Sequence, residues 1–190
     1  SSYPKPGNVH RTFDFQATHY EHFLASTVVL TSHLKYAADE GAKASREEIS
    51  LKQVGVGKII RNSVADVMKW QHGGNTLLGS IILLVPMAVA AGLTLKENPH
   101  FSSRNFRTSL KSVVESTTAE DAMKVYDAIS LAKPGGLGKA PQLDVTDAKS
   151  RKQILERDIS LFEIFKISSA WDSISAEWTT NYHVTVDIGY

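Results

Sequence analysis

The sequence contains no cysteine, and that absence removes several kinds of chemistry at once. Disulfide bonds, cysteine-ligated zinc, iron–sulfur clusters and thiolate catalysis are all excluded. A chain without cysteine also fits a reducing compartment, so we expect a cytoplasmic protein.

The sequence also lacks an excess of either charge. Its 21 lysine and arginine residues face 20 aspartate and glutamate residues, which gives a formal net charge of +1. Nucleic-acid-binding domains usually carry a strong basic excess, so we expect no nucleic-acid partner. The 190 residues are 42% hydrophobic, which excludes a disordered chain and predicts one domain over residues 1–190. Because the chain starts at Ser1 and stops at Tyr190 within an alternating run, we expect it to be truncated at both ends.

A long stretch without charge covers residues 73–95 and meets the length criterion for a membrane span. Pro86 lies in its middle, Gly79 and Gly92 lie on either side, and no basic cluster anchors its ends. Two interpretations are open, a membrane-spanning helix and a helix buried on all sides within a helical domain. The pattern favours the buried helix, so we expect no membrane partner.

Hydrophobic periodicity predicts a helical domain for most of the chain. Apolar residues recur at helical spacing, and turn-forming residues separate the runs. The predicted helices cover residues 15–39, 51–70, 73–92, 101–114, 118–132 and 148–182. Residues 183–188 alternate like a strand. We therefore expect an all-α fold around a buried apolar central helix, with a short strand-like C-terminal tail.

Asp158 is the first candidate for a functional carboxylate. On the predicted 148–182 helix it shares its face with apolar residues: Ile154, Leu155, Leu161, Phe162 and Phe165. A carboxylate on such a face is costly unless it is paired, protonated or bound to a metal. Two interpretations stay open, a structural ion pair, for example with Arg157, and a functional group.

Glu21 and two histidines raise similar questions on the first predicted helix. Glu21 lies among small and apolar residues, so it either points inward or reaches solvent from the helix edge, and the pattern favours solvent. His19 and His22 are one turn apart and could share a metal ion, but no third ligand is signalled. A polar strip that faces a cleft or solvent is the alternative for this pair.

The N-terminal loop has the composition of a phosphate-binding loop. Two prolines stiffen residues 3–10, Gly7 and Asn8 form a turn, and Lys5 supplies a positive charge for phosphate. An ordinary surface turn is the alternative.

Two further loops are rich in glycine. In residues 73–76, Asn75 or Thr76 can cap the following helix, whose free N–H groups would form an anion site. Residues 134–138 include Gly135 and Gly136, but they match neither a Walker A loop nor a dinucleotide-binding fingerprint.

Five short motifs occur in a fixed order along the chain: PKPGNVHR (4–11), EHFLAS (21–26), GGNTLLG (73–79), PGGLG (134–138) and ERD (156–158). Together they resemble the triphosphoribosyl-dephospho-CoA synthase family, especially its archaeal-type branch, over nearly the whole chain. Members of this family generally extend beyond the point where this chain ends.

The resemblance implies an all-α transferase. Its ATP substrate would donate triphosphoribose to dephospho-CoA or a related coenzyme precursor, with release of adenine. The reaction needs carboxylates to stabilise an oxocarbenium-like centre and to take a proton, and Mg²⁺ to bind the triphosphate. The resemblance implies that Asp158 and Glu21 fill the catalytic and metal-binding roles. The implied phosphate-binding residues are Lys5, Gly7, Asn8, Asn75, Thr76, Gly135 and Gly136.

One departure from the family pattern leaves a second interpretation open. The citrate-lyase branch has a His-Lys pair after the Asn-Thr, whereas this chain has Leu77 and Leu78. The alternative is a helical module that binds a nucleotide or coenzyme without this transferase activity. The oligomeric state is also open, with a homodimer as one alternative.

Overall fold

The computed structural model describes residues 3–4, 6–95, 102–135, 138 and 140–188. Its elements are α1 (Tyr20–Ser45), η1 (Leu51–Val54), α2 (Val56–Trp70), α3 (Leu78–Thr94), α4 (Ser103–Glu115), α5 (Ala119–Ala132), α6 (Ala148–Glu156), α7 (Leu161–Ser168), α8 (Ser173–Thr179) and η2 (Val184–Ile188). Within the described residues, the β-structure is limited to one isolated bridge between His10 and Phe13. The predicted all-α class is therefore confirmed.

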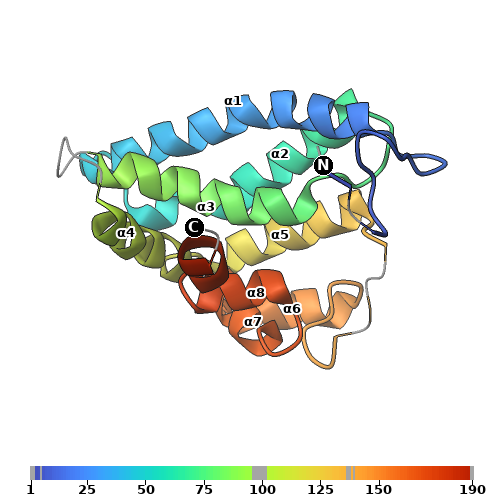
Figure 1. Ribbon diagram of the computed structural model, residues 1–190. Helices are drawn as coiled ribbons and strands as arrows, with labels where there is room; N and C mark the ends of the chain where they lie inside the picture. The colour runs from blue at the N-terminus through green and yellow to red at the C-terminus, as the bar shows by residue number, and fades with distance from the viewer. Residues whose placement is uncertain (1–2, 5, 96–101, 136–137, 139, 189–190) are drawn as a thin grey trace.

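Helix α3 lies at the centre of the molecule, as the uncharged segment predicted. It contacts α1, α2, α4, α5 and α8, and Figure 1 shows it between α1 on one side and α8 on the other. Val85, Val89 and Ala90 are completely buried, while Leu84 is 38% exposed on the outer edge. In the described parts of the chain, no helix combines the length and the apolar character needed to cross a bilayer.

Two glycines bring α1 and α3 into backbone contact. A Cβ atom on Gly41 would lie 2.0 Å from the carbonyl oxygen of Val89, and one on Gly92 would lie 1.9 Å from that of Ala38. Side chains cannot fit at such distances, so both positions require glycine. The contact also corrects a prediction. The first helix was expected to end at residue 39, but α1 continues to Ser45 because Gly41 packs against α3.

The start of α2 packs against the start of α5 through another glycine. A Cβ atom on Gly57 would lie 2.2 Å from the carbonyl oxygen of Asp121. The Gly57 amide donates a hydrogen bond of 2.8 Å to Asp121 Oδ1, and the Thr118 amide donates one of 2.8 Å to Oδ2. Asp121 is 4% exposed, so one buried carboxylate caps both helices.

Pro86 creates the docking point for the C-terminal helices. Because proline has no N–H group, the carbonyl of Ile82 loses its partner within α3. The indole N–H of Trp178 donates to that carbonyl at 3.3 Å, and the hydroxyl of Tyr182 donates to the neighbouring Leu83 carbonyl at 3.1 Å. Both aromatic side chains are fully buried, and burial raises the pKa of the Tyr182 hydroxyl well above its usual value. Helix α8 therefore packs against the part of α3 where the Ile82 carbonyl has no hydrogen-bond partner within its own helix.

The predicted single helix over residues 148–182 is wrong, because the segment forms α6, α7 and α8. Ser160 caps α7 by accepting a hydrogen bond from the Glu163 amide, and Asp172 caps α8 by accepting one from the Ser175 amide. Ser, Thr, Asp and Asn side chains compete with helical hydrogen bonds and favour new N-termini. Apolar periodicity continues across these breaks and therefore did not reveal them.

The C-terminal tail is helical, so the predicted strand over residues 183–188 is also wrong. Residues Val184–Ile188 form a π-helical turn. The buried carboxylate of Glu177 accepts hydrogen bonds from the Val184 amide at 2.9 Å and the Thr185 amide at 2.8 Å. The alternation of Val184, Val186 and Ile188 indicated a strand, but Glu177 caps the tail as a helical turn.

The glycine contact between α1 and α3 gives a first test. We expect Gly92→Ala to lower the free energy of unfolding by about 3 kcal/mol or more, because its Cβ would collide with the α1 backbone. Gly79→Ala in the same helix is the matched control, since its Cβ would meet only the movable end of Ile174 at 3.3 Å. The control should stay within about 1 kcal/mol of the parent. Urea unfolding measures both, and equal stabilities of the two variants would contradict the contact.

A double-mutant cycle tests the role of Pro86. Trp178→Phe removes the hydrogen bond to the Ile82 carbonyl and should cost about 1–3 kcal/mol. In a Pro86→Ala background, residue 86 regains an N–H group that can pair with this carbonyl. We therefore expect Trp178→Phe to cost about 1 kcal/mol less in that background. If the two substitutions instead have additive effects on the free energy of unfolding, measured by heat or urea, the pairing between Trp178 and the Ile82 carbonyl does not depend on Pro86.

Candidate active site

The GGNT loop docks on the start of α1, so two of the sequence motifs come together. The Thr18 hydroxyl donates to the Gly73 carbonyl at 2.6 Å, and the hydroxyls of Ser26 and Thr76 are 2.7 Å apart. Ser26 is fully buried and also donates to the His22 carbonyl at 2.6 Å. These bonds connect the EHFLAS and GGNTLLG segments, which are 50 residues apart in the chain.

The shape of the GGNT loop depends on Gln71 and His22. Gln71, which is buried, accepts a hydrogen bond from the Gly73 amide at 2.6 Å and donates one to the Gly74 carbonyl at 2.7 Å. Gly73 lies directly against the imidazole of His22, because a Cβ atom there would be 2.2 Å from Nδ1. Gly74 has a φ of 77°, which favours glycine. The hydrogen bonds of Gln71 therefore fix the loop from inside, and its contact with His22 fixes it against α1.

Asn75 lies two residues before Leu77, the N-cap residue of α3, so the N-cap that the sequence predicted at Asn75 or Thr76 is one or two residues too early. Its Oδ1 accepts a hydrogen bond from the Leu78 amide at 3.1 Å. The side chain of Asn75 is exposed, so the N-terminus of α3 opens toward solvent. Helix N-termini carry a partial positive charge and bind anions readily.

Helix α1 starts in a network of acidic and imidazole groups. Asp14 lies 3.1 Å from His19 Nδ1 and accepts a hydrogen bond from the Tyr20 amide at 3.0 Å. These bonds, the one from His19 first, hold the pKa of the Asp14 carboxyl below its usual value. The His22 ring accepts a hydrogen bond from the His19 amide at 3.0 Å. Both histidines thus use Nδ1 to build the helix start.

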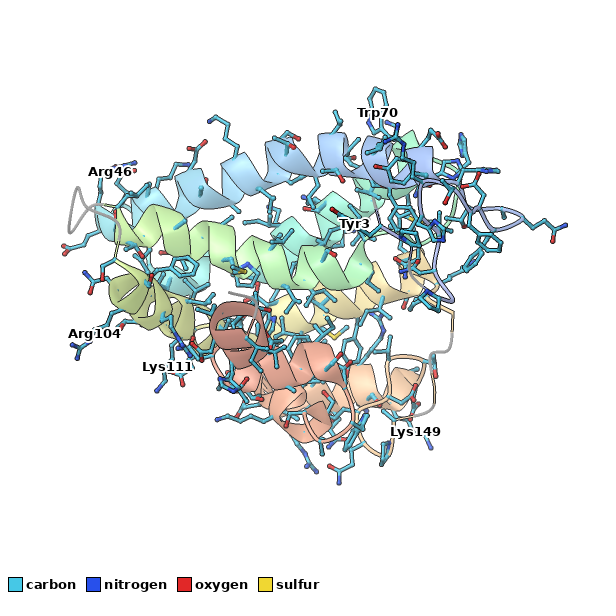
Figure 2. The ribbon with its side chains drawn as sticks, in the orientation of Figure 1. Tyr3, Arg46, Trp70, Arg104, Lys111 and Lys149 are labelled. Carbon is cyan, nitrogen blue, oxygen red and sulfur yellow. The ribbon has the colours of Figure 1, made fainter. Side chains whose placement is uncertain are left out.

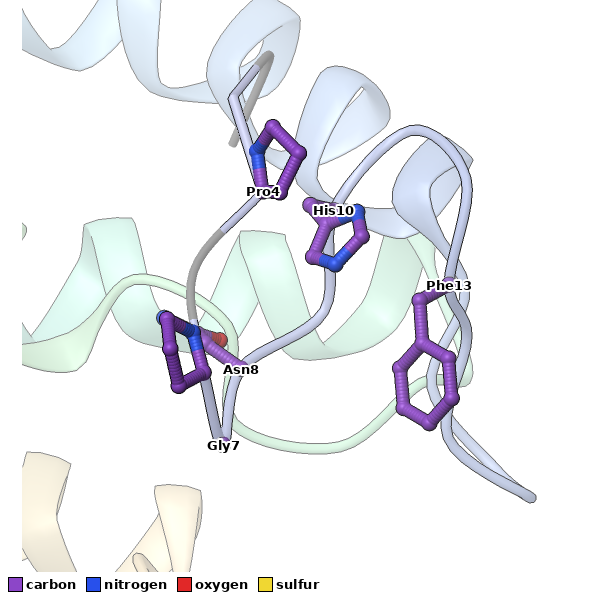
Figure 3. A pocket seen from close by; sticks show the side chains of 6 residues that line it. Pro4, Gly7, Asn8, His10 and Phe13 are labelled. Carbon is purple, nitrogen blue, oxygen red and sulfur yellow. The ribbon is translucent and has the colours of Figure 1, made fainter.

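The N-terminal loop folds back on itself and forms a cavity that is open to solvent. His10 and Phe13 exchange backbone hydrogen bonds of 3.0 and 2.9 Å, and Asn8 Oδ1 accepts one of 2.8 Å from the Val9 amide. Val9 is buried and anchors the loop. A cavity of about 340 Å³ is lined by Pro4, Pro6, Gly7, Asn8, His10 and Phe13 (Figure 3). Gly7 has a φ of 73°, which the Gly-Asn turn requires.

These segments gather at one end of the molecule. We call residues 6–15, residues 71–76 and the first two turns of α1 the loop cluster. Figure 1 places the end of α5, which leads to Lys133 and Gly135, at the same end. Trp70 is exposed there and projects outward from the end of α2 (Figure 2). Gly135 is exposed, whereas Lys5 and Gly136 lie outside the described residues.

Glu21 faces solvent, which is the alternative that its pattern favoured. It shares the outer face of α1 with Leu24 and Val28, which are 50% and 75% exposed. The carboxylate lies in the first turn of α1, where negative charge is favourable next to the helix N-terminus.

Asp158 is exposed, so the prediction that it lies on a buried helix face is wrong. It follows α6 in a left-handed conformation, with a φ of 50°. The Ile159 amide donates to the Ile154 carbonyl at 3.0 Å, and the Asp158 amide donates to the Leu155 carbonyl at 3.4 Å. This is the Schellman pattern that ends helices. The apolar residues that were expected to share a helical face with Asp158 belong instead to α6 and α7, which this turn separates.

Glu21 and Asp158 belong to elements that are far apart in the sequence, Glu21 to the first turn of α1 and Asp158 to the turn between α6 and α7. Figure 1 places α1 along one side of the molecule and the α6–α7 turn along the other. Across the described residues, no three histidine, aspartate or glutamate side chains are grouped so that they could hold a metal ion. Mg²⁺ needs only one or two protein carboxylates beside substrate phosphates, so the metal-binding roles of Glu21 and Asp158 stay predictions from the sequence.

Sequence reasoning missed the residues that assemble the loop cluster. Thr18, Ser26 and Gln71 hold the GGNT loop against α1, yet each is an ordinary polar residue in the sequence. The available signal was the pair of motifs itself, because a glycine-rich loop needs partners for its backbone groups. Nothing in the spacing identified which residues supply those partners.

The family model for CitG, ATP:dephospho-CoA triphosphoribosyl transferase, matches residues 1–190. No curated protein matches the chain. The fold is similar to a crystal structure from Archaeoglobus fulgidus named a "putative triphosphoribosyl-dephospho-CoA synthase", with a TM-score of 0.59 and 19% sequence identity. The match covers 88% of this chain and 60% of that one. Because the family model spans the whole chain, the protein belongs to the CitG family of ATP:dephospho-CoA triphosphoribosyl transferases.

Proposed function

We propose that the protein carrying this chain transfers triphosphoribose from ATP to dephospho-CoA or a related coenzyme precursor. The observation that carries this proposal is the family match over all 190 residues. In the proposed reaction, the bond between the ribose C1′ and adenine breaks, and a hydroxyl oxygen of the acceptor forms a new bond to C1′. Adenine leaves with the bonding electrons and takes up a proton, while the acceptor hydroxyl loses one.

The loop cluster is the proposed place of substrate binding. Gly7 and Asn8 offer an open turn beside a cavity, and Asn75 and Thr76 lie at the N-terminus of α3. Backbone N–H groups at such a terminus suit a triphosphate, because they supply hydrogen bonds and a favourable dipole. The exposed rings of Phe13 and Trp70 offer faces on which adenine could stack.

The proposal assigns no residue of this chain to Mg²⁺. Mg²⁺ usually keeps several waters and is held mainly by substrate phosphates with one or two carboxylates. A requirement for Mg²⁺ and a cytoplasmic location therefore stay predictions from the sequence. The phosphate-binding roles of Lys5, Gly135 and Gly136 stay predictions as well.

A second candidate function is a nucleotide- or coenzyme-binding module without transferase activity. The observation that favours it is the Leu77-Leu78 pair, which replaces the His-Lys pair of the citrate-lyase branch. Mass spectrometry of the full-length protein incubated with ATP and dephospho-CoA separates the two candidates. Free adenine and a dephospho-CoA product that carries triphosphoribose support the transferase. Binding of either compound without adenine release supports the binding module.

A matched pair of threonine variants tests the loop cluster. We expect Thr76→Val to lower kcat/KM about tenfold, because it removes a hydroxyl beside the α3 N-terminus and its bond to Ser26. Thr27→Val is the control, since the Thr27 hydroxyl is exposed and bonds only to the Phe23 carbonyl of its own helix. Steady-state adenine release measures both. A normal rate for Thr76→Val would place phosphate binding elsewhere.

Asp158 can be tested for function separately from stability. Asp158→Gly should raise the free energy of unfolding by about 1 kcal/mol, because glycine adopts the left-handed conformation without strain. If Asp158 contacts substrate, activity should nevertheless fall at least tenfold.

Glu47→Gly is the matched control, since Glu47 is exposed and left-handed, with a φ of 61° at the equivalent position after α1. It should gain similar stability and keep full activity. Thermal melts and adenine-release assays on both variants decide the question. An Asp158→Gly enzyme that is stabilised and fully active would remove Asp158 from the site.

A further inference from the structure

A second polar cavity lies away from the loop cluster, where α2 and α5 begin. It has a volume of about 450 Å³, which lies within the range of small-molecule sites. Three lysines line it, Lys52 from η1, Lys58 from α2 and Lys124 from α5. Elements that are distant in sequence therefore direct three positive charges to one hollow.

The three lysines of this cavity have no ion-pair partner among the described residues, a property that they share with other described lysines such as Lys149. Lys35, Lys43, Lys111 and Lys152 each lie within 4.0 Å of a carboxylate on their own helix. In the described structure, no ion pair within that distance involves Lys52, Lys58 or Lys124. Glu120 lines the same cavity four residues before Lys124, a spacing that often gives a helical ion pair, yet the two do not pair here. The three ammonium groups are therefore available to a ligand.

Of the two carboxylates that line the cavity, Glu120 and Asp121, the latter is already engaged in hydrogen bonds. Asp121 also lines the cavity, but its Oδ1 accepts the Gly57 amide, and its Oδ2 accepts the Thr118 amide and hydroxyl at 2.8 and 2.9 Å. Both oxygens of Asp121 are thus engaged by the starts of α2 and α5. Gly55, with a φ of 67°, turns the chain from η1 into α2 and brings Lys52 and Lys58 to the same cavity.

We propose that this cavity binds a polyphosphate group, meaning two or more linked phosphates of a small molecule. Three lysines from three different elements spread their positive charge over the cavity, and a chain of linked phosphates carries more negative charge over a greater length than one phosphate does. Lysine serves well here because its flexible stem lets a point charge follow phosphates in several positions.

This cavity is separate from the loop cluster. Lys58 lies in the first turn of α2, whereas Gln71 and the GGNT loop follow the last turn of the same 15-residue helix. A helix of that length is about 22 Å long, so one triphosphate cannot reach both places. The inference therefore goes beyond the proposed substrate site and does not depend on it.

Titration of the full-length protein with inorganic tripolyphosphate tests the proposal, with amide NMR shifts and calorimetry as readouts. We expect saturable shifts at Gly55, Val56 and Lys58, and weaker binding of inorganic orthophosphate. Shifts at Gly73–Thr76 report the loop cluster separately, so failure of one site is distinguishable from failure of the other. A parallel titration with ATP identifies the source of the polyphosphate. Tighter binding of ATP at Lys58 indicates a nucleotide, and equal binding indicates the free polyphosphate.

Lysine variants complete the test. Lys58→Gln should raise the Kd for tripolyphosphate at least about tenfold, and Lys58→Arg should largely restore it. Lys149→Gln is the control, because Lys149 is exposed, has no ion pair among the described residues, and lies on the side of the molecule away from α1 (Figure 2). Circular dichroism confirms folding of each variant. Absence of shifts at Gly55–Lys58, or an unchanged Kd for Lys58→Gln, would overturn the proposal.

Discussion

The backbone contact between α1 and α3 fixes the geometry on which the loop cluster depends. Gly41 and Gly92 set this contact near the C-terminal ends of the two helices, and Ser26 meets Thr76 near their N-terminal ends. The helices therefore run parallel, with contact points separated by about 22 Å along α1. A shift at the glycines would move the GGNT loop relative to His22, because a packed pair of helices moves as a rigid unit. Packing far from the loops thus determines their positions.

Helix α3 also holds the C-terminal third of the chain, for a different physical reason. Proline inside a buried helix leaves a carbonyl that cannot reach water, and such a group requires a partner. Trp178 and Tyr182 supply the partners for the α3 carbonyls around Pro86. Phe165 of α7 then packs edge-on against Trp178, with ring centres 4.8 Å apart. One missing N–H group therefore organises the packing of two later helices.

The sequence predicted the helical class, the central helix and the order of most helices, because these follow from hydrophobic periodicity. It did not predict helix ends that depend on contacts between distant residues. The first helix was expected to end at residue 39, yet α1 continues through Gly41, whose lack of a side chain allows the contact with α3. The strand-like alternation of the tail was overridden by Glu177, whose carboxylate satisfies two tail amides. Local side-chain caps at Ser160 and Asp172 were readable in principle, yet continuous apolar spacing concealed them.

In the candidate site, too, the sequence predicted features that depend on neighbouring residues better than features that depend on tertiary contacts. Motif composition identified the loops at Gly7-Asn8 and Asn75-Thr76, since turn and cap chemistry is local. Asp158 was expected on a buried helix face, but a left-handed turn at this residue ends α6 and leaves the carboxylate exposed. Leu77 packs against the core and Leu78 is buried, so these two side chains point away from the position where a charged pair would meet phosphate. Any anion held at this end of α3 must therefore rely on backbone N–H groups, Asn75 and Thr76, together with charges from other segments.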